Sequence, residues 1–503
     1  MDNFKLHIKP ELPSGRWNLF VFYLKKNLLI ENFASWHGFV FFSVIASFIA
    51  FGIANIGMEI GLLAIGAMVG IPVVYFVIIS PPFGIMVYLC YAYTMMWMMR
   101  LGVPIPLGTL MDVFLALFIL GFFIQMKKKP EWEKMKNPIS TMILVWIGYN
   151  IFQVANPAAA SRLAWLGALR TVALVSLYYF VFILHVRTKK FLIIIIKWWI
   201  FASFINACYA FKQEYFGFFP FEQAYLDSDP MIANLLFIAG HWRKFSMFSD
   251  PVTFAYNMAM ASLLCMGLLS GPMKLYKKAI LTFLAIFFLY VMLFSGTRGA
   301  YPLVPLALML YAILKFNKQV LIFTGMGLLF FVFLIFMPTS NQSILRFQSA
   351  FRPGEDASYN VRKLNQARIK PFVYSHPIGG GLGATEYFGQ KYAPDSYLAN
   401  FPPDSGYVRV TVELGYIGLF IFCLMIFTVL KTGINYYYKI RDPQLKSFLL
   451  AMLLVIFAWN IGNFPQEAFV QYPSNVLFFL SIALMVVIYR IDVQQNLATD
   501  ATT

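Results

Sequence analysis

The chain has 503 residues, of which 60 % are hydrophobic and 12 % are charged, and its mean hydropathy is +0.70. Soluble domains carry roughly 45–50 % apolar and about 25 % charged residues, so this composition excludes a soluble protein. It predicts an all-α polytopic membrane protein. Lys and Arg outnumber Asp and Glu by 39 to 22, which suits anionic lipid or an anionic substrate. Since no basic run lies outside the short loops, we expect no nucleic-acid partner.

The chain begins with a polar and amphipathic stretch, residues 1–35, which we expect to be a cytoplasmic arm with an interfacial helix at 17–29. Apolar runs near the length that crosses a bilayer then predict about 14 transmembrane helices, within a range of 12–14. Their expected positions are 38–56, 57–79, 82–99, 109–126, 139–155, 163–185, 191–212, 250–270, 279–296, 300–316, 319–337, 411–430, 447–463 and 474–490.

These runs divide the chain into a transmembrane bundle at 36–337, C-terminal transmembrane helices at 411–490 and a cytoplasmic tail at 491–503. The bundle is interrupted by a polar loop at 213–249, and a much larger loop, partly helical and partly irregular, is expected at 338–410. Phe, Tyr and Ile are spread through the larger loop and give it apolar surface to bury. We therefore expect a folded cap rather than a disordered linker.

The distribution of basic residues predicts the orientation. An even number of spans puts both termini on one side, and the loops on that side carry most of the Lys and Arg, including KKKPEWEKMK at 127–136. By the positive-inside rule both termini are cytoplasmic. The loops 213–249 and 338–410, and the turn SGTRG at 295–299, are then expected on the outer face.

Four basic residues near that face are candidate anion ligands. Arg298 lies in FSGTRGAYP, where small neighbours leave backbone N–H groups open and the following span offers a helix N-terminus; the alternative is a guanidinium that reaches the outer headgroups. Arg170 lies inside a span, which indicates a functional site or a salt bridge to another helix. Arg243 and Lys244 precede the span at 250–270.

Two carboxylates accompany the chain's return to the membrane after the large loop. Asp404 follows a Pro pair at an expected helix start, so it is either a helix cap or a general base at the membrane boundary. Glu413 lies nine residues further on, inside the apolar run, and we expect it to pair with Arg298 or Arg170. Asp250, before Pro251, is expected to cap the span that follows it.

The two long loops hold the remaining candidates. Arg362 and Arg368 suit an anionic substrate, although a solvated surface is the alternative. His376 opens the glycine run HPIGGGLG at 376–383, which permits close backbone approach. Asp227 and Asp229 resemble a carboxylate pair for a divalent metal, but this pattern is common by chance. We expect neither a metal site nor a cofactor.

Three blocks together resemble a known family. FSGTRGAYPLVPLALML, SYNVRKLNQARIKPFVYSHPIGGGLGATE and DSGYVRVTVELGYIGLF are similar, in order and spacing, to the signature of the O-antigen ligase and polymerase superfamily, and RKFSMFSDPVTFAYNMA is similar to the segment that precedes them. The resemblance implies a metal-independent bacterial membrane glycosyltransferase. Its donor is a glycan on a polyprenyl (undecaprenyl) diphosphate at the outer face of the cytoplasmic membrane. Arg298 would contact the diphosphate, with Arg243 nearby.

One position departs from the family pattern. Members that act as ligases have His where this chain has Asp404, which favours a polymerase that joins O-antigen or exopolysaccharide repeat units. The alternative is a ligase that attaches the glycan to lipid A core or protein, and a second alternative is a flippase for lipid-linked glycans. The expected partners are the lipid-linked donor, a glycan or lipid acceptor, membrane lipids and other polysaccharide-assembly proteins.

Overall fold

The structure is a computed structural model that describes residues 58–102, 107–128, 130–238, 240–340, 357–468 and 470–500, with scattered residues between 40 and 55 and between 345 and 351. The expected arm at 1–35 lies outside the described residues. The chain divides into two units, Met1–Phe76 and Val77–Thr503. The site and everything that positions it belong to the second unit.

Within the described residues the fold is helical apart from one short hairpin, in which β1 (Phe237–Ile238) pairs antiparallel with β2 (His241–Trp242). The α-helices are α3 (Met58–Ile79), α4 (Pro81–Arg100), α5 (Leu107–Lys128), α6 (Pro138–Phe152), α7 (Arg162–Val172), α8 (Tyr178–His185), α9 (Lys189–Tyr215), α10 (Pro220–Asp227), α11 (Pro230–Leu236), α12 (Pro251–Leu269), α13 (Leu275–Met292), α14 (Leu303–Lys315), α15 (Lys318–Phe336), α17 (Ala357–Ser375), α18 (Glu386–Tyr392), α19 (Gly406–Lys439), α20 (Pro443–Gly462) and α21 (Ser474–Asp500).

The predicted class is confirmed: the protein is an all-α polytopic membrane protein. In the part of the chain that the structure describes, 11 helical segments are long and apolar enough to cross a membrane. The expected number, 14, is not reached there. The run at 300–316 contains α14, whose 13 residues are fewer than the roughly twenty typical of a span, and the runs at 38–56 and 57–79 are described only in part. The number of 14 therefore stays a prediction.

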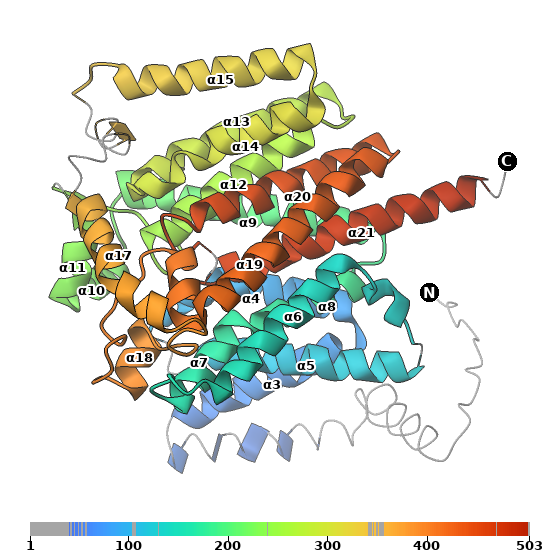
Figure 1. Ribbon diagram of the computed structural model, residues 1–503. Coiled ribbons are helices and arrows are strands. Elements are labelled where there is room, and N and C mark those ends of the chain that lie inside the picture. Colours follow the sequence, from blue (N-terminus) through green and yellow to red (C-terminus); the bar gives the residue numbers. More distant parts are fainter. Residues whose placement is uncertain are drawn as a thin grey trace, which may run out of the picture. The chain divides into compact units, whose positions relative to one another are not determined.

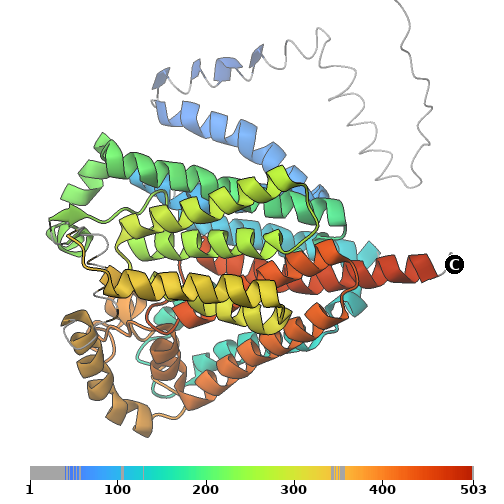
Figure 2. The same cartoon turned by 90° about the horizontal axis from the view of Figure 1, so that it is seen from above.

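The most buried spans are α12, α20 and α21, and they form the centre of the bundle. Because their sequences are apolar on all sides, surrounding them with other helices buries every face. Small residues bring the helices close: a Cβ on Gly267 of α12 would lie 2.4 Å from the Cα of Ala451 in α20. Trp199 of α9 stacks on Trp459 of α20 with ring centroids 6.3 Å apart. Figure 2 shows α21 running along this centre.

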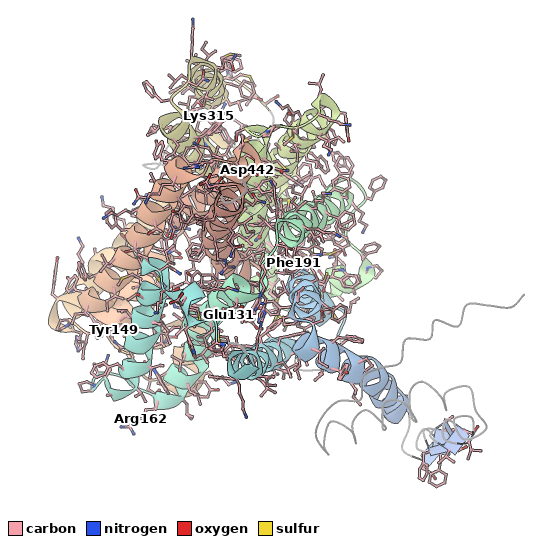
Figure 3. The ribbon with its side chains drawn as sticks, turned by 90° about the vertical axis from the view of Figure 1, so that its right-hand side faces the viewer. Glu131, Tyr149, Arg162, Phe191, Lys315 and Asp442 are labelled. Atoms are coloured by element: carbon pink, nitrogen blue, oxygen red, sulfur yellow. The ribbon has the colours of Figure 1, made fainter. Side chains whose placement is uncertain are left out.

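The segments that connect the spans of the second unit lie at two opposite ends of the bundle. Figure 1 shows α10, α11, α17 and α18 together at one end and the C-terminus at the other. Figure 3 looks at that second end, where Glu131 and Asp442 are labelled; Glu131 accepts from Arg187 at 2.7 Å and Asp442 from Lys189 at 2.6 Å. The two long loops that the charge pattern assigns to one face therefore do share an end of the bundle.

Three boundaries differ from those expected. The loop expected at 213–249 begins after α9, which continues to Tyr215, and it folds into α10, α11 and the hairpin. The large loop ends earlier than expected, because α19 starts at Gly406 rather than 411, and α21 continues through Asp500 into the expected tail. We call the segment 357–405, which contains α17 and α18, the large loop from here on.

Candidate active site at one end of the bundle

One cavity of about 950 Å³ opens at the end where α10, α11 and the large loop gather. Its cationic lining consists of Arg243, Arg298 and Arg362, and Asp404 lies in the same cavity. Its remaining lining residues are Ile238, Val252, Gly296, Thr297, Gly299, Pro302, Phe351, Tyr407, Ile426, Leu430, Phe457, Asn460, Ile461, Phe464, Pro465 and Gln466. We call this space the central cavity. Segments far apart in the sequence thus place three guanidinium groups and a carboxylate around one volume.

Arg298 is carried by a turn of small residues between α13 and α14. After α13 the chain forms a three-residue 3₁₀ turn at Leu293–Ser295, and Gly296 adopts φ +57° before a second such turn begins at Arg298. This left-handed conformation is one that glycine adopts without a steric cost. The helix N-terminus expected directly after Arg298 is not there, because α14 begins only at Leu303. The first turn of α14 therefore does not place its backbone N–H groups directly after Arg298, where we expected them to bind an anion.

Arg243 is fixed to the same turn. Its Nε donates to the carbonyl of Ser295 at 2.8 Å, and its Nη2 donates to Oγ1 of Thr297 at 3.0 Å. The backbone N–H of Arg243 donates to the carbonyl of Leu236, at the end of α11. Because both contacts to the turn lie within three residues of Arg298, the two guanidinium groups are held near each other by the fold.

Asp404 lies between Pro403 and Ser405 at the entry to α19, and it is half-buried. Its φ is +54°, a backbone conformation that non-glycine residues adopt mainly when they are Asn or Asp, or when their surroundings impose it. The helix cap proposed as its alternative role is occupied by Ser405. Asp404 is therefore not the N-cap of α19, and its carboxylate borders the central cavity.

Arg362 reaches the cavity from α17 of the large loop. Two other candidates of this loop, Arg368 and His376, lie elsewhere. Arg368 is exposed on α17 and is not part of the cavity lining. His376 stacks on Phe372 with ring centroids 4.1 Å apart, and its Nδ1 lies 2.9 Å from Oγ of Ser375.

Two basic candidates have acidic partners outside the cavity. Lys244 is buried, its Nζ donates to the carbonyl of Trp242 at 2.8 Å, and it pairs with Glu214 at 3.2 Å. Burial lowers the pKa of Lys244 and Glu214 partly offsets this effect. Arg170 pairs with Asp112 of α5 at 3.0 Å, which is the salt bridge weighed against a functional role. Neither residue lines the central cavity.

The expected partner of Glu413 was wrong. Glu413 pairs with neither Arg298 nor Arg170 but with Arg409, four residues before it on α19, at 3.3 Å. Its carboxylate also accepts from the backbone N–H groups of Gly383 and Thr385 at 3.0 and 3.3 Å, and from the Thr385 hydroxyl at 2.5 Å. Glu413 therefore anchors the large loop rather than contacting the cavity.

The glycine run docks on a break in α19. Gly415 has φ +70° and ψ −172°, and this break frees the carbonyls of Val412 and Glu413. They accept from the N–H groups of Gly380 and Gly381 at 2.9 Å each. A Cβ at Gly415 would lie 2.0 Å from the carbonyl oxygen of Pro377. The expected close backbone approach is present, and the partner is the protein's own helix.

The weak metal candidates are used locally. Asp229 caps α11 by accepting from the N–H of Met231 at 2.8 Å, and Asp227 accepts from Gln223 at 3.0 and 3.1 Å. Within the described residues no group of three or more His, Cys, Asp or Glu side chains is placed to hold a metal ion. Asp250, in contrast, caps α12 through the N–H groups of Val252 and Thr253, as predicted.

Sequence reasoning missed Arg409, Tyr407, Asn460 and Gln466. Tyr407, Asn460 and Gln466 line the cavity from α19, α20 and the turn after α20. Arg409 lies behind this wall with only 12 % of its side chain exposed. The four-residue spacing between Arg409 and Glu413 is the one available signal for the pair.

These features define a class: a multi-pass membrane protein with a cationic cavity at one end of its helical bundle. Comparison with known proteins shows what this part of the chain is similar to. Residues 283–423 match the family model described as O-antigen ligase. A protein of Salmonella muenchen, named O-antigen polymerase, is 28 % identical over 182 residues. This match covers 35 % of this chain and 43 % of the relative. Both matches support the resemblance to the O-antigen ligase and polymerase superfamily that the motifs predicted.

Proposed function

We propose that the protein is a membrane glycosyltransferase that transfers a glycan from a polyprenyl diphosphate to an acceptor hydroxyl. One observation carries the proposal: three guanidinium groups and a carboxylate share a cavity that also has an apolar lining. A lipid diphosphate combines a dense negative charge with a hydrocarbon chain, so each part of the donor finds a matching part of the cavity.

The apolar lining extends down the bundle between α19 and α20. Ile426 and Leu430 come from α19, and Phe457 and Ile461 come from α20. Ile426 and Leu430 lie beyond the break at Gly415, and all four side chains belong to the two spans. They provide a surface for the isoprene units next to the diphosphate, which aligns the tail with the membrane and leaves the glycan at the outer end.

The proposed reaction needs one base and a cation to receive the leaving group. The acceptor oxygen attacks the anomeric carbon of the donor sugar, the bond from that carbon to the diphosphate oxygen breaks, and its electron pair leaves with the diphosphate. Asp404 accepts the hydroxyl proton. Arg298, Arg243 and Arg362 stabilise the charge that develops on the leaving group.

Since guanidinium groups supply this positive charge, we propose that transfer requires no divalent metal. A chelator should leave the rate of the purified protein unchanged, and restored metal should not raise it. A rate that collapses with chelator and returns with Mg²⁺ or Mn²⁺ would overturn this part of the proposal.

A polymerase is the favoured activity. The relative from Salmonella muenchen is named a polymerase, and Asp404 occupies the position at which the resemblance implies His in ligases. The family model, by contrast, is described as O-antigen ligase, so a ligase that transfers the glycan to lipid A core or protein is the second candidate. In either case we propose the cytoplasmic membrane of a bacterium, with the cavity facing outward and both termini inside.

The two activities differ in their products. The full-length protein in lipid nanodiscs would receive a defined lipid-linked repeat unit, with and without a lipid A core acceptor, and the products would be sized. A ladder of repeats without the core acceptor is the expected result. One addition to the core, without a ladder, would identify a ligase, and no new glycosidic bond under either condition would refute the proposed function.

A further inference from the structure

Four charged side chains from three segments meet behind the wall of the central cavity. Nη1 of Arg409 lies 2.6 Å from Glu467 and 3.6 Å from Glu386, and its Nε lies 3.3 Å from Glu413. We call these four residues the Arg409 cluster. Glu386 opens α18 in the large loop, Arg409 and Glu413 lie on α19, and Glu467 lies between α20 and α21. One buried guanidinium therefore joins three parts of the chain.

Two of these parts line the cavity. Arg409 lies just over one helical turn after Asp404, and Glu467 directly follows Phe464, Pro465 and Gln466, which are lining residues. The segment before Glu467 is also bonded to the start of α19, because the N–H of Gly406 donates to the carbonyl of Asn463 at 3.0 Å. Arg409 itself does not line the cavity, so any effect it has on bound substrate must pass through these segments.

The third part is the large loop. Thr385, next to Glu386, donates its hydroxyl to Glu413, and Glu386 has φ +51°. A glutamate in this left-handed conformation is held there by its surroundings at a conformational cost. The contact with Arg409 is one of the interactions that offset that cost. The cluster thus fixes the loop that carries Arg362 to the helix that follows Asp404.

We propose that Arg409 is a positioning residue for the central cavity, which it shapes by fixing the large loop, the start of α19 and the α20–α21 connection to one another, and that this fixation depends on a proton carried by Glu386. The inference deepens the proposed function, because glycan transfer is one of its readouts. The fixation of the three segments to one another can be measured without any substrate.

Three carboxyl groups surround the single guanidinium of Arg409. This excess of negative charge favours a proton on Glu386. Glu386 faces Arg409, Glu413 and Asp404 from α19 and its entry, and Glu467 from the α20–α21 connection. Its own helix carries Tyr387 and Lys391, and α7, which packs on α18 at Gly167 and Phe388, carries Arg162 and Arg170. Burial first, and then the charge of Glu467, raises the pKa of Glu386 to about 7.

The sign of the pH effect follows. Because the pKa of Glu386 is higher in the folded protein than in the unfolded chain, the folded state binds the proton more tightly. The stabilisation that results is present below the unfolded pKa and is lost as the pH rises through about 7. Above that pH a third negative charge stands against one guanidinium, which weakens the hold of the loop on α19.

The first test measures hydrogen exchange in the full-length protein without substrate. Arg409→Lys keeps the charge but loses the fork of donors, and Glu467→Gln removes one partner. Both variants should speed exchange in residues 379–392 and, together with it, in residues 463–468. Asp395→Asn, which removes an exposed acid of the same loop, is the matched control and should exchange as the unmodified protein does. Unchanged exchange at 463–468 in both variants would overturn the positioning role.

The second test compares pH profiles of exchange, corrected for the chemical exchange rate, and of glycan transfer. Between about pH 6 and pH 8, which bracket the Glu386 pKa, the unmodified protein should lose protection in both segments as the pH rises. Glu386→Gln should abolish this loss, and Asp395→Asn should keep it. A Glu386→Gln variant with the unmodified pH dependence would overturn the role of a proton on Glu386.

The transfer assay separates this inference from the proposed function. Arg409→Lys should lower kcat/KM for the donor about tenfold, the size expected for coupled contacts, while Glu386→Gln should flatten the pH profile without that loss. If the unmodified protein forms no glycosidic bond, the proposed function fails, and the exchange measurements still decide whether Arg409 positions the cavity. If transfer is normal in Arg409→Lys, positioning fails and the proposed function stands.

Discussion

Arg298 and Arg243 share a single scaffold. The turn at residues 295–299 presents Arg298, and Arg243 donates to Ser295 and Thr297 of that same turn. A side chain held by two hydrogen bonds loses little further freedom when an anion binds, so Arg243 is preorganised for the diphosphate that we propose as its ligand.

Removal of the Arg298 guanidinium should therefore stop the reaction without unfolding the protein. Arg298→Ala is expected to lower transfer by about a hundredfold or more, measured on protein that is monodisperse in nanodiscs. Arg162→Ala is the matched control: Arg162 is exposed at the start of α7 and lies outside the cavity, so its variant should keep the unmodified rate. Full activity in Arg298→Ala would remove this residue from the mechanism.

Asp404 allows a substitution that separates charge from backbone. Asn accepts the left-handed conformation nearly as well as Asp does, so Asp404→Asn keeps φ near +54° while losing the base. Transfer should fall about 10²- to 10⁴-fold with an unchanged melting temperature, and Asp404→Ala should lower both. An unchanged rate in Asp404→Asn would show that the acceptor proton leaves by another route.

At the level of single residues, the sequence predicted which side chains line the cavity better than it predicted which side chains form ion pairs. Arg298, Arg243 and Asp404 were candidates from their motifs, and they do line one cavity. Lys244 and Arg170 had the same kind of local context, but acids on other helices, Glu214 and Asp112, lie within ion-pair distance of them. Such a partner is set by tertiary packing, which no local pattern encodes.

Arg409 was missed for a related reason. Its spacing to Glu413 was readable on one helix, whereas Glu386 and Glu467 lie in segments that only the folded chain brings together. An arginine in a helical run next to the large loop gave no reason to expect three acidic partners.

Among the elements, α19 has the most consequential local feature. Its break at Gly415 supplies the carbonyls that bind the glycine run, and it divides the helix into a part next to the large loop and a part within the bundle. The sequence showed that the glycines needed room for close approach. The sequence did not show that α19 is the partner of the glycine run. The carbonyls that α19 offers become free only because Gly415 adopts a positive φ, which a glycine permits but does not require.

Adding a side chain at this break should detach the large loop. Gly415→Ala forces a Cβ into the carbonyl of Pro377 and a left-handed φ onto alanine, which alone costs about 1–3 kcal/mol. We expect faster proteolysis within 357–405 and loss of transfer. Gly325→Ala, in α15 where no atom lies within 4 Å of the added Cβ, should resemble the unmodified protein. Equal protease resistance in the two variants would contradict the docking role.

For the molecule as a whole, hydropathy predicted the helical membrane class and most span positions, because apolar length is a local property. The span expected at 300–316 stays a prediction, because α14 there has only 13 residues. Hydropathy did not show which spans form the centre, since α12, α20 and α21 are no more apolar than several peripheral helices. At Gly267, the absence of a side chain permits close packing of α12 on α20.

The orientation of the whole molecule remains a prediction from its basic loops. Reporter fusions should show residue 134 and the C-terminus on the cytoplasmic side, and an insertion after Asp395 on the outer side. A reporter that is active only in the cytoplasm should give a signal at residue 134 and at the C-terminus. A reporter that is active only outside should give a signal at the insertion after Asp395. The opposite pattern at residue 395 would place the central cavity against the cytosol and rule out an outward-facing donor site.

The central cavity, at about 950 Å³, is near the upper end of the range for a single small-molecule site, roughly 300–1,000 Å³. For the polymerase that we propose, the product is far larger than this cavity, so only the sugars next to the bond being made can be enclosed, and the rest of both chains lies in water. Discrimination would then rest on the one or two sugars at the junction. Branches and substituents further along the glycan would not contact the cavity. A protein of this design could therefore accept repeat units that differ in their distant parts.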